Sequence, residues 1–149
     1  MIMVLFGPPG CGKGTQAGII SKDIDIPHLS TGDMLRDAVK SKTETGLKAA
    51  SIMEKGKLVS DEIVINIIKD RICSNDCKNG FILDGFPRTV SQAKELDVML
   101  TIENMKVDLV VDFSVNDEAL ISRIEGRFSC GDCGAGYNDH TKLPIKEGI

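Results

Sequence analysis

The sequence of 149 residues has few aromatic side chains and no excess of positive charge. It contains no tryptophan, one tyrosine and five phenylalanines, and 22 Asp and Glu outnumber 18 Lys and Arg, which gives a net charge of −4. Nucleic-acid-binding domains usually carry a basic surface, and those that bind single strands add aromatic side chains on which bases stack. The composition therefore argues against a nucleic-acid-binding protein, and we expect no nucleic-acid partner.

Long apolar runs and a secretory signal are also lacking. No run approaches the ~18 residues typical of a membrane span. The start, MIMVLFGPPG, lacks the basic segment and the small-residue cleavage site of a signal peptide. The five cysteines are an odd number for a disulfide framework, and Cys11 lies within a glycine-rich loop, which fits a reducing compartment. We expect no membrane partner and a cytoplasmic location.

Short apolar runs alternate with longer amphipathic segments, in a chain that is 42% hydrophobic and long enough for about one domain. This alternation predicts an α/β fold, with a parallel sheet covered by helices on both faces. Gly46 is expected to separate the second and third helices, and Ser60 to cap the fourth. The predicted buried strands are 2–6, 81–83 and 107–113, and the predicted helices are 12–24, 30–40, 44–56, 60–72, 91–99 and 117–126.

The segment GPPGCGKGTQ, residues 7–16, places Gly7, Gly12 and Lys13 at the spacing of a Walker A phosphate-binding loop. It lies between a predicted strand and a predicted helix, where glycines let backbone N–H groups surround a phosphate and the start of the helix favours negative charge. The alternative is a glycine-rich turn that holds no ligand. We interpret Cys11 as a small loop side chain rather than a nucleophile.

Gly14 stands where the generic loop has Ser or Thr, and in this form the loop resembles that of the adenylate kinases and related nucleoside monophosphate kinases. LSTGDMLR at 29–36 and DGFPRTVSQ at 84–92 are similar to two further motifs of that family, in the same order. The resemblance covers the chain almost end to end. It implies reversible, Mg²⁺-dependent phosphoryl transfer from ATP to AMP, giving two ADP.

The resemblance also implies a domain organisation. The fold would be a P-loop three-layer sandwich with a parallel sheet, formed by residues 1–29 and 60–125. Residues 30–59 would form a helical AMP-binding insertion, and residues 126–149 part of a lid. Members of the family continue beyond the point where this sequence ends, so we expect it to be incomplete at its C-terminus. The complete enzyme is expected to be a monomer.

For the acceptor nucleotide, the resemblance implies that Arg36 and Arg88 hold the AMP phosphate, which suits the planar guanidinium group. By the same resemblance, Thr31 and Gln92 favour adenine over a pyrimidine base. Asp84, at the end of a predicted strand, would bind Mg²⁺ through water. Judged alone, a helix arginine is more often solvated, and an Asp before Gly is often part of a turn. The expected AMP-binding residues are Thr31, Arg36, Lys57, Leu58, Val59, Gly85, Phe86, Pro87, Arg88 and Gln92.

For the donor nucleotide, Arg123 and Arg127 are predicted to share one helical face. By resemblance, Arg127 contacts the donor phosphates and Arg123 lies against the adenine. Tyr137 matches a lid position that touches the nucleotide, with a packed lid aromatic as the alternative. The expected ATP-binding residues are Gly10, Cys11, Gly12, Lys13, Gly14, Thr15, Arg123, Arg127, Gly136 and Tyr137. The expected catalytic residues are Lys13, Arg36, Asp84, Arg88 and Arg127.

The other cysteines fall into two pairs. Cys130 and Cys133 form a C-x₂-C motif, and the resemblance implies a structural Zn²⁺ in the complete lid, with the partner ligands beyond residue 149. Four ligands are needed, and Asp139 and His140 are an alternative source. We place Cys73 and Cys77 four residues apart on one helix, and we expect Cys73 to face the core and Cys77 to be incidental.

Two alternatives to an active adenylate kinase stay open. The chain is a nucleotide-binding fragment with impaired catalysis, because the missing segment carries further lid arginines in the family, or it is a related kinase that uses GTP as donor. A zinc ribbon that contacts nucleic acid is disfavoured by the acidic charge and the few aromatics.

Overall fold

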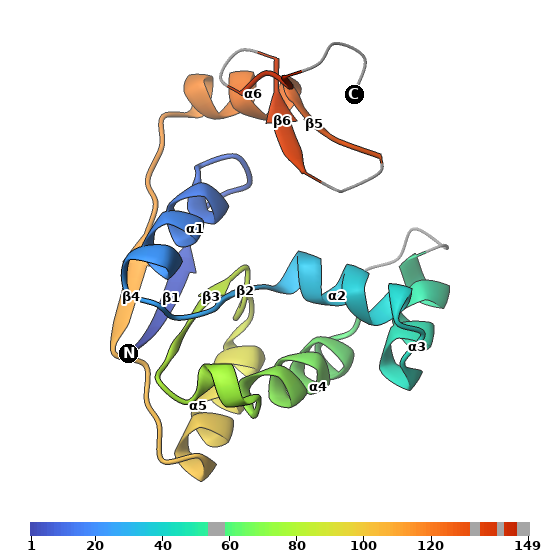
Figure 1. The fold of residues 1–149 in the computed structure, drawn as a ribbon, viewed down its shortest axis with the longest axis vertical. Coiled ribbons are helices and arrows are strands. Elements are labelled where there is room, and N and C mark those ends of the chain that lie inside the picture. Colours follow the sequence, from blue (N-terminus) through green and yellow to red (C-terminus); the bar gives the residue numbers. More distant parts are fainter. Residues whose placement is uncertain (54–58, 132–134, 140–141, 146–149) are drawn as a thin grey trace. The chain divides into compact units, whose positions relative to one another are not determined.

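The computed structural model describes residues 1–53, 59–131, 135–139 and 142–145 (Figure 1). The chain divides into two compact units, each of which is described by itself. The first contains Met1–Phe6 and Lys13–Asp112, and the second contains Gly7–Gly12 and Phe113–Ile149. Among the described residues, no helix has the length and apolar character needed to cross a membrane.

The first unit is built on a four-stranded parallel sheet with the order β2-β3-β1-β4. The predicted strands are confirmed, but β2 was not anticipated because its three residues contain one apolar side chain, Leu29. β3 lies between β1 and β2, so the carboxyl ends of β1 and β3 flank the point where the strand order reverses, which is where such sheets bind ligands. The strands are β1 Ile2–Phe6, β2 His28–Ser30, β3 Phe81–Asp84 and β4 Leu109–Asp112.

The helices of this unit follow the predicted pattern, with different ends. The expected break at Gly46 is wrong, because the chain leaves the helical conformation at residues 41–43 and Gly46 lies inside α3. Ser60 does occupy the cap position of α4, although its side chain makes no capping hydrogen bond. The helices are α1 Lys13–Asp23, α2 Thr31–Lys40, α3 Glu44–Met53, α4 Asp61–Ile72 and α5 Val90–Ile102, with a 3₁₀ turn η1 at Asn75–Cys77.

Helices cover both faces of the sheet, as predicted. Side chains alternate between the two faces along a strand. On one face, Val4 and Leu83 belong to a buried cluster. α4 contributes Ile68 to the same cluster, and α5 contributes Leu96. The alternate positions, such as Met3 and Ile82, are buried as well, on the face that α1 covers through its contacts with β1, β2 and β3. The unit is thus a three-layer α/β sandwich.

β4 departs from the prediction of a buried strand at 107–113. Leu109 and Val110 are 45% and 55% exposed. β4 pairs with β1 along one edge, and it is the last strand of the sheet among the described residues. An apolar run predicts extended structure, whereas burial depends on what packs against the strand.

The prediction for Cys73 and Cys77 is also wrong, because the two residues have exchanged roles. Cys77 is fully buried and belongs to the core cluster, whereas Cys73 is exposed. The reason is that α4 ends at Ile72, so Cys73 caps the helix and Cys77 lies in η1 rather than on the same helix. Burial raises the pKa of the Cys77 thiol to about 11.

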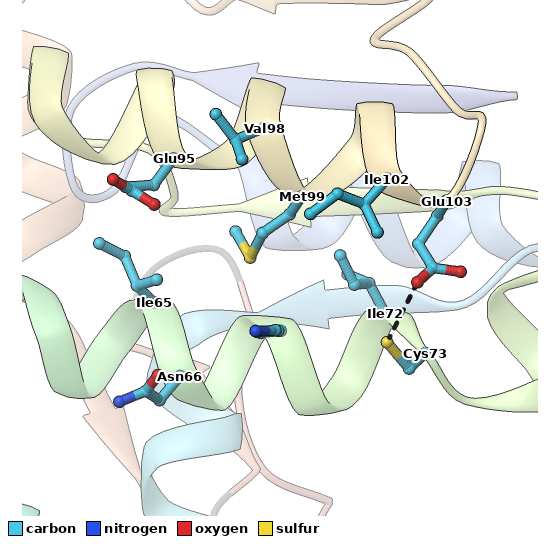
Figure 2. A pocket seen from close by; sticks show the side chains of 10 residues that line it. Ile65, Asn66, Ile72, Cys73, Glu95, Val98, Met99, Ile102 and Glu103 are labelled. Atoms are coloured by element: carbon cyan, nitrogen blue, oxygen red, sulfur yellow. Dashed lines mark hydrogen bonds between the residues drawn. The ribbon is translucent and has the colours of Figure 1, made fainter.

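α4 and α5 lie side by side and run in the same direction. Their first turns are joined by a hydrogen bond between Asp61 and Gln92, and their last turns by a weak contact from Cys73 Sγ to Glu103 Oε1 at 4.0 Å. A largely apolar cavity of about 190 Å³ lies between their later turns, where Figure 2 shows Ile72, Met99 and the Cys73–Glu103 contact.

The second unit contains a helix and a hairpin. α6 spans Asp117–Glu125, and the Asn116 side chain caps it by accepting hydrogen bonds from two backbone N–H groups. β5 (Arg127–Ser129) and β6 (Gly136–Asn138) pair in antiparallel fashion. The rings of Phe128 and Tyr137 stack across the hairpin with centroids 5.7 Å apart. This hairpin was not predicted, because its strands have only three residues each.

Candidate active site

The glycine-rich loop lies in the second unit and needs its glycines for two different reasons. Gly7, Gly10 and Gly12 have φ of 139°, 83° and 101°, values that L side chains rarely adopt. A β-carbon on Gly7 would also lie 2.9 Å from Cys11 Sγ and from two atoms of Phe113, whereas one on Gly12 would meet nothing within 4 Å. Gly7 therefore provides close packing, and Gly12 leaves open space beside the backbone that is expected to face phosphate.

Cys11 packs inside this loop. Its side chain is 6% exposed and lies beside Gly7. Its backbone N–H donates to the Pro8 carbonyl oxygen at 3.3 Å. A buried thiol within the loop acts as a small packing group, which agrees with the interpretation of Cys11 from the sequence as a small loop side chain.

Within the first unit, α1 begins at Lys13, so its first backbone N–H groups and Lys13 supply positive charge at one place. Gly14 is the next residue, and a β-carbon there would lie 3.4 Å from Asp84 Oδ2. The absence of a side chain at position 14 lets the Asp84 carboxylate lie close to the start of α1.

Asp84 ends β3 and is paired in register with Leu5 and Ser30. Its side chain is 14% exposed, and Oδ2 lies 3.2 Å from Nε2 of His28. Carboxylate oxygens are the ligands that Mg²⁺ prefers, commonly with water still bound to the ion, so Asp84 fits the expected magnesium role. His28 was not predicted as a neighbour, because β2 was not recognised from the sequence.

Thr31, Gly85 and Arg88 come together at the carboxyl end of β3. The Thr31 hydroxyl donates to the carbonyl oxygens of Asp84 and Gly85, at 3.2 and 3.1 Å. Arg88 Nε donates to the Gly85 carbonyl oxygen at 2.7 Å. A β-carbon on Gly85 would lie 2.7 Å from Thr31 Oγ1 and 3.1 Å from Arg88 Nη2. Only glycine therefore lets the loop pass between these side chains.

Arg36 lies one turn along α2 from this cluster. Its guanidinium packs against Gly32, 3.4 Å from the position of a β-carbon there, and forms an ion pair with Asp33. Burial raises the pKa of Asp33, but hydrogen bonds to Arg36 and Ser30 outweigh it, so the pKa lies below its ordinary value. Asp33 stays ionised at neutral pH and holds the guanidinium.

Gln92 lies in the first turn of α5 and is 4% exposed. Its Oε1 accepts from the Arg88 backbone N–H at 2.7 Å, and its Nε2 donates to Asp61 Oδ1 at 2.6 Å. Asp61 was missed in the sequence, where it reads as an ordinary acidic residue in the first turn of a helix. Phe86 is part of the buried core, so its side chain anchors this loop to the core.

In the second unit, the prediction that Arg123 and Arg127 share a helical face is wrong. α6 ends at Glu125 with Gly126 as its cap, so Arg127 lies in β5. Arg123 does lie near the glycine-rich loop, since a β-carbon on Gly10 would be 3.8 Å from Arg123 Cβ and 3.1 Å from Ile124. The Tyr137 ring stacks on the Phe128 ring, and Lys142 Nζ lies over the Tyr137 ring, 5.6 Å from the ring centroid.

Four residues of the predicted sites lie outside the described residues: Lys57, Leu58, Cys133 and the alternative zinc ligand His140. Val59, next to the first two, is half-buried. Cys130 is buried, and within the described part of the chain no group of three or more His, Cys, Asp or Glu side chains could hold a metal ion.

Comparison with known proteins identifies the family of this chain. A family model described as adenylate kinase matches residues 5–145. The adenylate kinases of Rhizobium etli strain CFN 42 and Caldicellulosiruptor bescii are each 52% identical over all 149 residues, which cover 69% of each relative. That of Magnetococcus marinus is 56% identical over 142 residues, which are 95% of this chain and 67% of the relative. Because the family model and these relatives match nearly the whole chain, the chain belongs to the adenylate kinase family.

Proposed function

We propose that this chain catalyses reversible phosphoryl transfer from ATP to AMP through the residues described above, giving two ADP. Its family identifies it as a phosphotransferase with ATP and AMP or ADP as substrates and Mg²⁺ as the accompanying ion. The observation that carries the assignment of residues is the cluster at the end of β3, where Asp84, Gly85, Thr31 and Arg88 meet.

On the donor side, we assign the ATP phosphates to the backbone of residues 10–15 and to Lys13. Three loop glycines with positive φ support this assignment, together with the start of α1 at Lys13. Arg123 and Arg127 are assigned to the same nucleotide, as are Gly136 and Tyr137. The stacking of Tyr137 on Phe128 also fits the alternative role of a packed lid aromatic.

On the acceptor side, we assign the AMP phosphate to Arg36 and Arg88. Both guanidinium groups are already oriented, Arg36 by Asp33 and Arg88 by the Gly85 carbonyl. Preorganised donors stabilise the charge of the transferring group without further rearrangement. Thr31, Gln92 and residues 57–59 are assigned to the nucleoside.

Magnesium, when bound, neutralises charge on the transferring phosphates. Asp84 is the residue that would hold it, through bound water. The His28 contact fixes the orientation of the carboxylate. We assign direct transfer between the two nucleotides, without a covalent enzyme intermediate; Cys11, the thiol within the loop, is buried.

We also propose a domain organisation. We assign residues 1–29 and 60–125 to the core, 30–59 to the AMP-binding domain and 126–149 to the lid. We also propose a cytoplasmic, monomeric complete enzyme without nucleic-acid or membrane partners. Zn²⁺ would be held by Cys130 and Cys133 when two further ligands are supplied beyond residue 149. Metal analysis of the chain extended beyond residue 149, with and without Cys130→Ser, tests the zinc proposal, which fails if the two extended chains contain the same amount of zinc.

Replacement of Arg88 by alanine tests the acceptor site. Loss of a preorganised charged donor is expected to lower kcat/KM for AMP by about 10²–10³-fold, with ATP binding unchanged. Lys94→Ala is the control, because Lys94 is exposed on α5. Equal loss in both variants would contradict the assignment. Binding of ATP and AMP without any ADP formation would favour the alternative of an impaired nucleotide-binding fragment, and faster turnover with GTP would favour the GTP-using relative.

A further inference from the structure

We propose that Asp61 is a positioning residue that fixes the side-chain amide of Gln92 and thereby selects a 6-aminopurine over a 6-oxopurine in the acceptor nucleotide. This inference rests on the proposed role of Gln92 at the AMP base. Asp61 does not itself touch the nucleotide in this account.

The contacts of Gln92 define which end of its amide points where. A glutamine amide has an acceptor oxygen and a donor NH₂ that can exchange places by rotation. Here Oε1 accepts from the Arg88 backbone N–H, which cannot act as an acceptor, and Nε2 donates to the Asp61 carboxylate, which cannot act as a donor when ionised. Rotation would place two donors together and two acceptors together.

Asp61 is itself held on both carboxylate oxygens. Oδ1 accepts from Gln92 Nε2 at 2.6 Å, and Oδ2 accepts from the Thr89 hydroxyl at 3.0 Å. The same hydroxyl accepts from the Gln92 backbone N–H at 3.1 Å and so caps α5. The carboxylate therefore joins the first turns of α4 and α5 and has little freedom to follow a rotating amide.

The surroundings make a wrong orientation costly. Gln92 is 4% exposed, and Asp61 is half-buried. A buried polar atom that faces a like partner loses its hydrogen bond without gaining water in exchange. The orientation of the amide is thus decided before a nucleotide arrives.

The fixed amide keeps one N–H and one oxygen lone pair for a ligand. The edge of adenine offers an amino donor beside a ring-nitrogen acceptor, whereas the edge of hypoxanthine or guanine offers a carbonyl acceptor beside a ring N–H donor. One amide orientation matches the first edge and the opposite orientation matches the second. A site whose polar groups are fixed in advance rejects the mismatched analogue because its groups would be left without partners.

The test is equilibrium binding of AMP and of inosine monophosphate, which replaces the amino group with a carbonyl. Asp61→Asn keeps the shape and supplies its own amide, which can pair with either end of Gln92. We define the selectivity ratio as the dissociation constant of inosine monophosphate divided by that of AMP. In Asp61→Asn we expect this ratio to fall by about tenfold, as for the loss of one hydrogen bond that distinguishes the two bases. The affinity for ATP should not change.

Glu62→Gln is the matched control, because it removes the same charge from the same turn of α4 at an exposed residue. It should leave the ratio as in the unaltered chain. An unchanged ratio in Asp61→Asn, with both nucleotides weakened equally, would overturn the inference, as would an unaltered chain that binds both nucleotides equally well. Gln92→Ala distinguishes failure of the proposed AMP site from failure of the role of Asp61. If Gln92→Ala leaves the affinity for AMP unchanged, the proposed site is wrong. If Gln92→Ala weakens AMP binding and the unaltered chain forms ADP, an unchanged ratio in Asp61→Asn overturns only the role of Asp61.

Discussion

The backbone of Ala38 in α2 occupies the space that a β-carbon on Gly46 would need in α3. The two helices are in contact along this line, so Gly46 sets how closely they approach. This contact explains why a glycine lies inside a helix, where it usually weakens the helix relative to alanine.

Gly46→Ala should therefore destabilise the chain, although alanine is the better helix former. Overpacking of this kind costs about 1–3 kcal/mol, which urea unfolding would report. Gly18→Ala is the control, because Gly18 lies inside α1 with nothing within 4 Å of a β-carbon. That substitution should stabilise the chain by about 0.5–1 kcal/mol. Equal effects of the two substitutions would contradict the close approach of α2 and α3.

The thiols of Cys73 and Cys77 should differ sharply in reactivity. Cys73 is exposed, whereas Cys77 is fully buried and its pKa is raised to about 11 by burial, so little thiolate forms at neutral pH. Brief alkylation at pH 7.5 followed by peptide mass spectrometry should label Cys73 and leave Cys77 unmodified. Unfolding in urea should make both react. Labelling of Cys77 in the folded chain would contradict its place in the core.

Stability should depend on pH through the pair between Arg71 and Asp76. The two carboxylate oxygens of Asp76 accept from the guanidinium at 2.8 and 2.6 Å, and the Arg71 hydrogen bond holds the pKa of Asp76 below its ordinary value. A lowered pKa in the folded state means that the contribution is present above about pH 4 and is lost as the pH falls through the folded-state pKa.

Asp76→Asn should accordingly lower the urea midpoint at pH 7 and make a smaller difference at pH 3. Asp97→Asn, at an exposed position on α5, controls for the loss of one negative charge. A difference between Asp76→Asn and the unaltered chain that is equally large at both pH values would show that the ion pair is not its cause.

How far the sequence predicts this molecule depends on how local each feature is. The glycine loop, the strand that ends at Asp84 and the helix that follows Ser60 are set by neighbouring residues, and the structure has them where they were predicted. Arg127 and Cys77 were misplaced because each was assigned to a helix that ends before it, α6 at Glu125 and α4 at Ile72, and helix ends are the least reliable part of such a prediction.

Other features could not be predicted because they depend on distant contacts. Asp61 reaches Gln92 across 31 residues, and His28 reaches Asp84 across 56. Each pair forms only when two helices or two strands lie side by side. The exposure of β4 has the same origin, since an apolar run does not reveal whether another segment packs on it.

In the proposed reaction, the loop at residues 7–13 serves ATP-dependent transfer to AMP. The direct measurement is ADP formation from ATP, AMP and Mg²⁺ by the unaltered chain, by Lys13→Ala and by Lys22→Ala, which changes an exposed lysine at the other end of α1. We predict ADP formation that requires AMP, a loss of at least about 10²-fold in Lys13→Ala and no loss in Lys22→Ala. Undiminished activity in Lys13→Ala, or ADP formation that does not require AMP, would contradict the account.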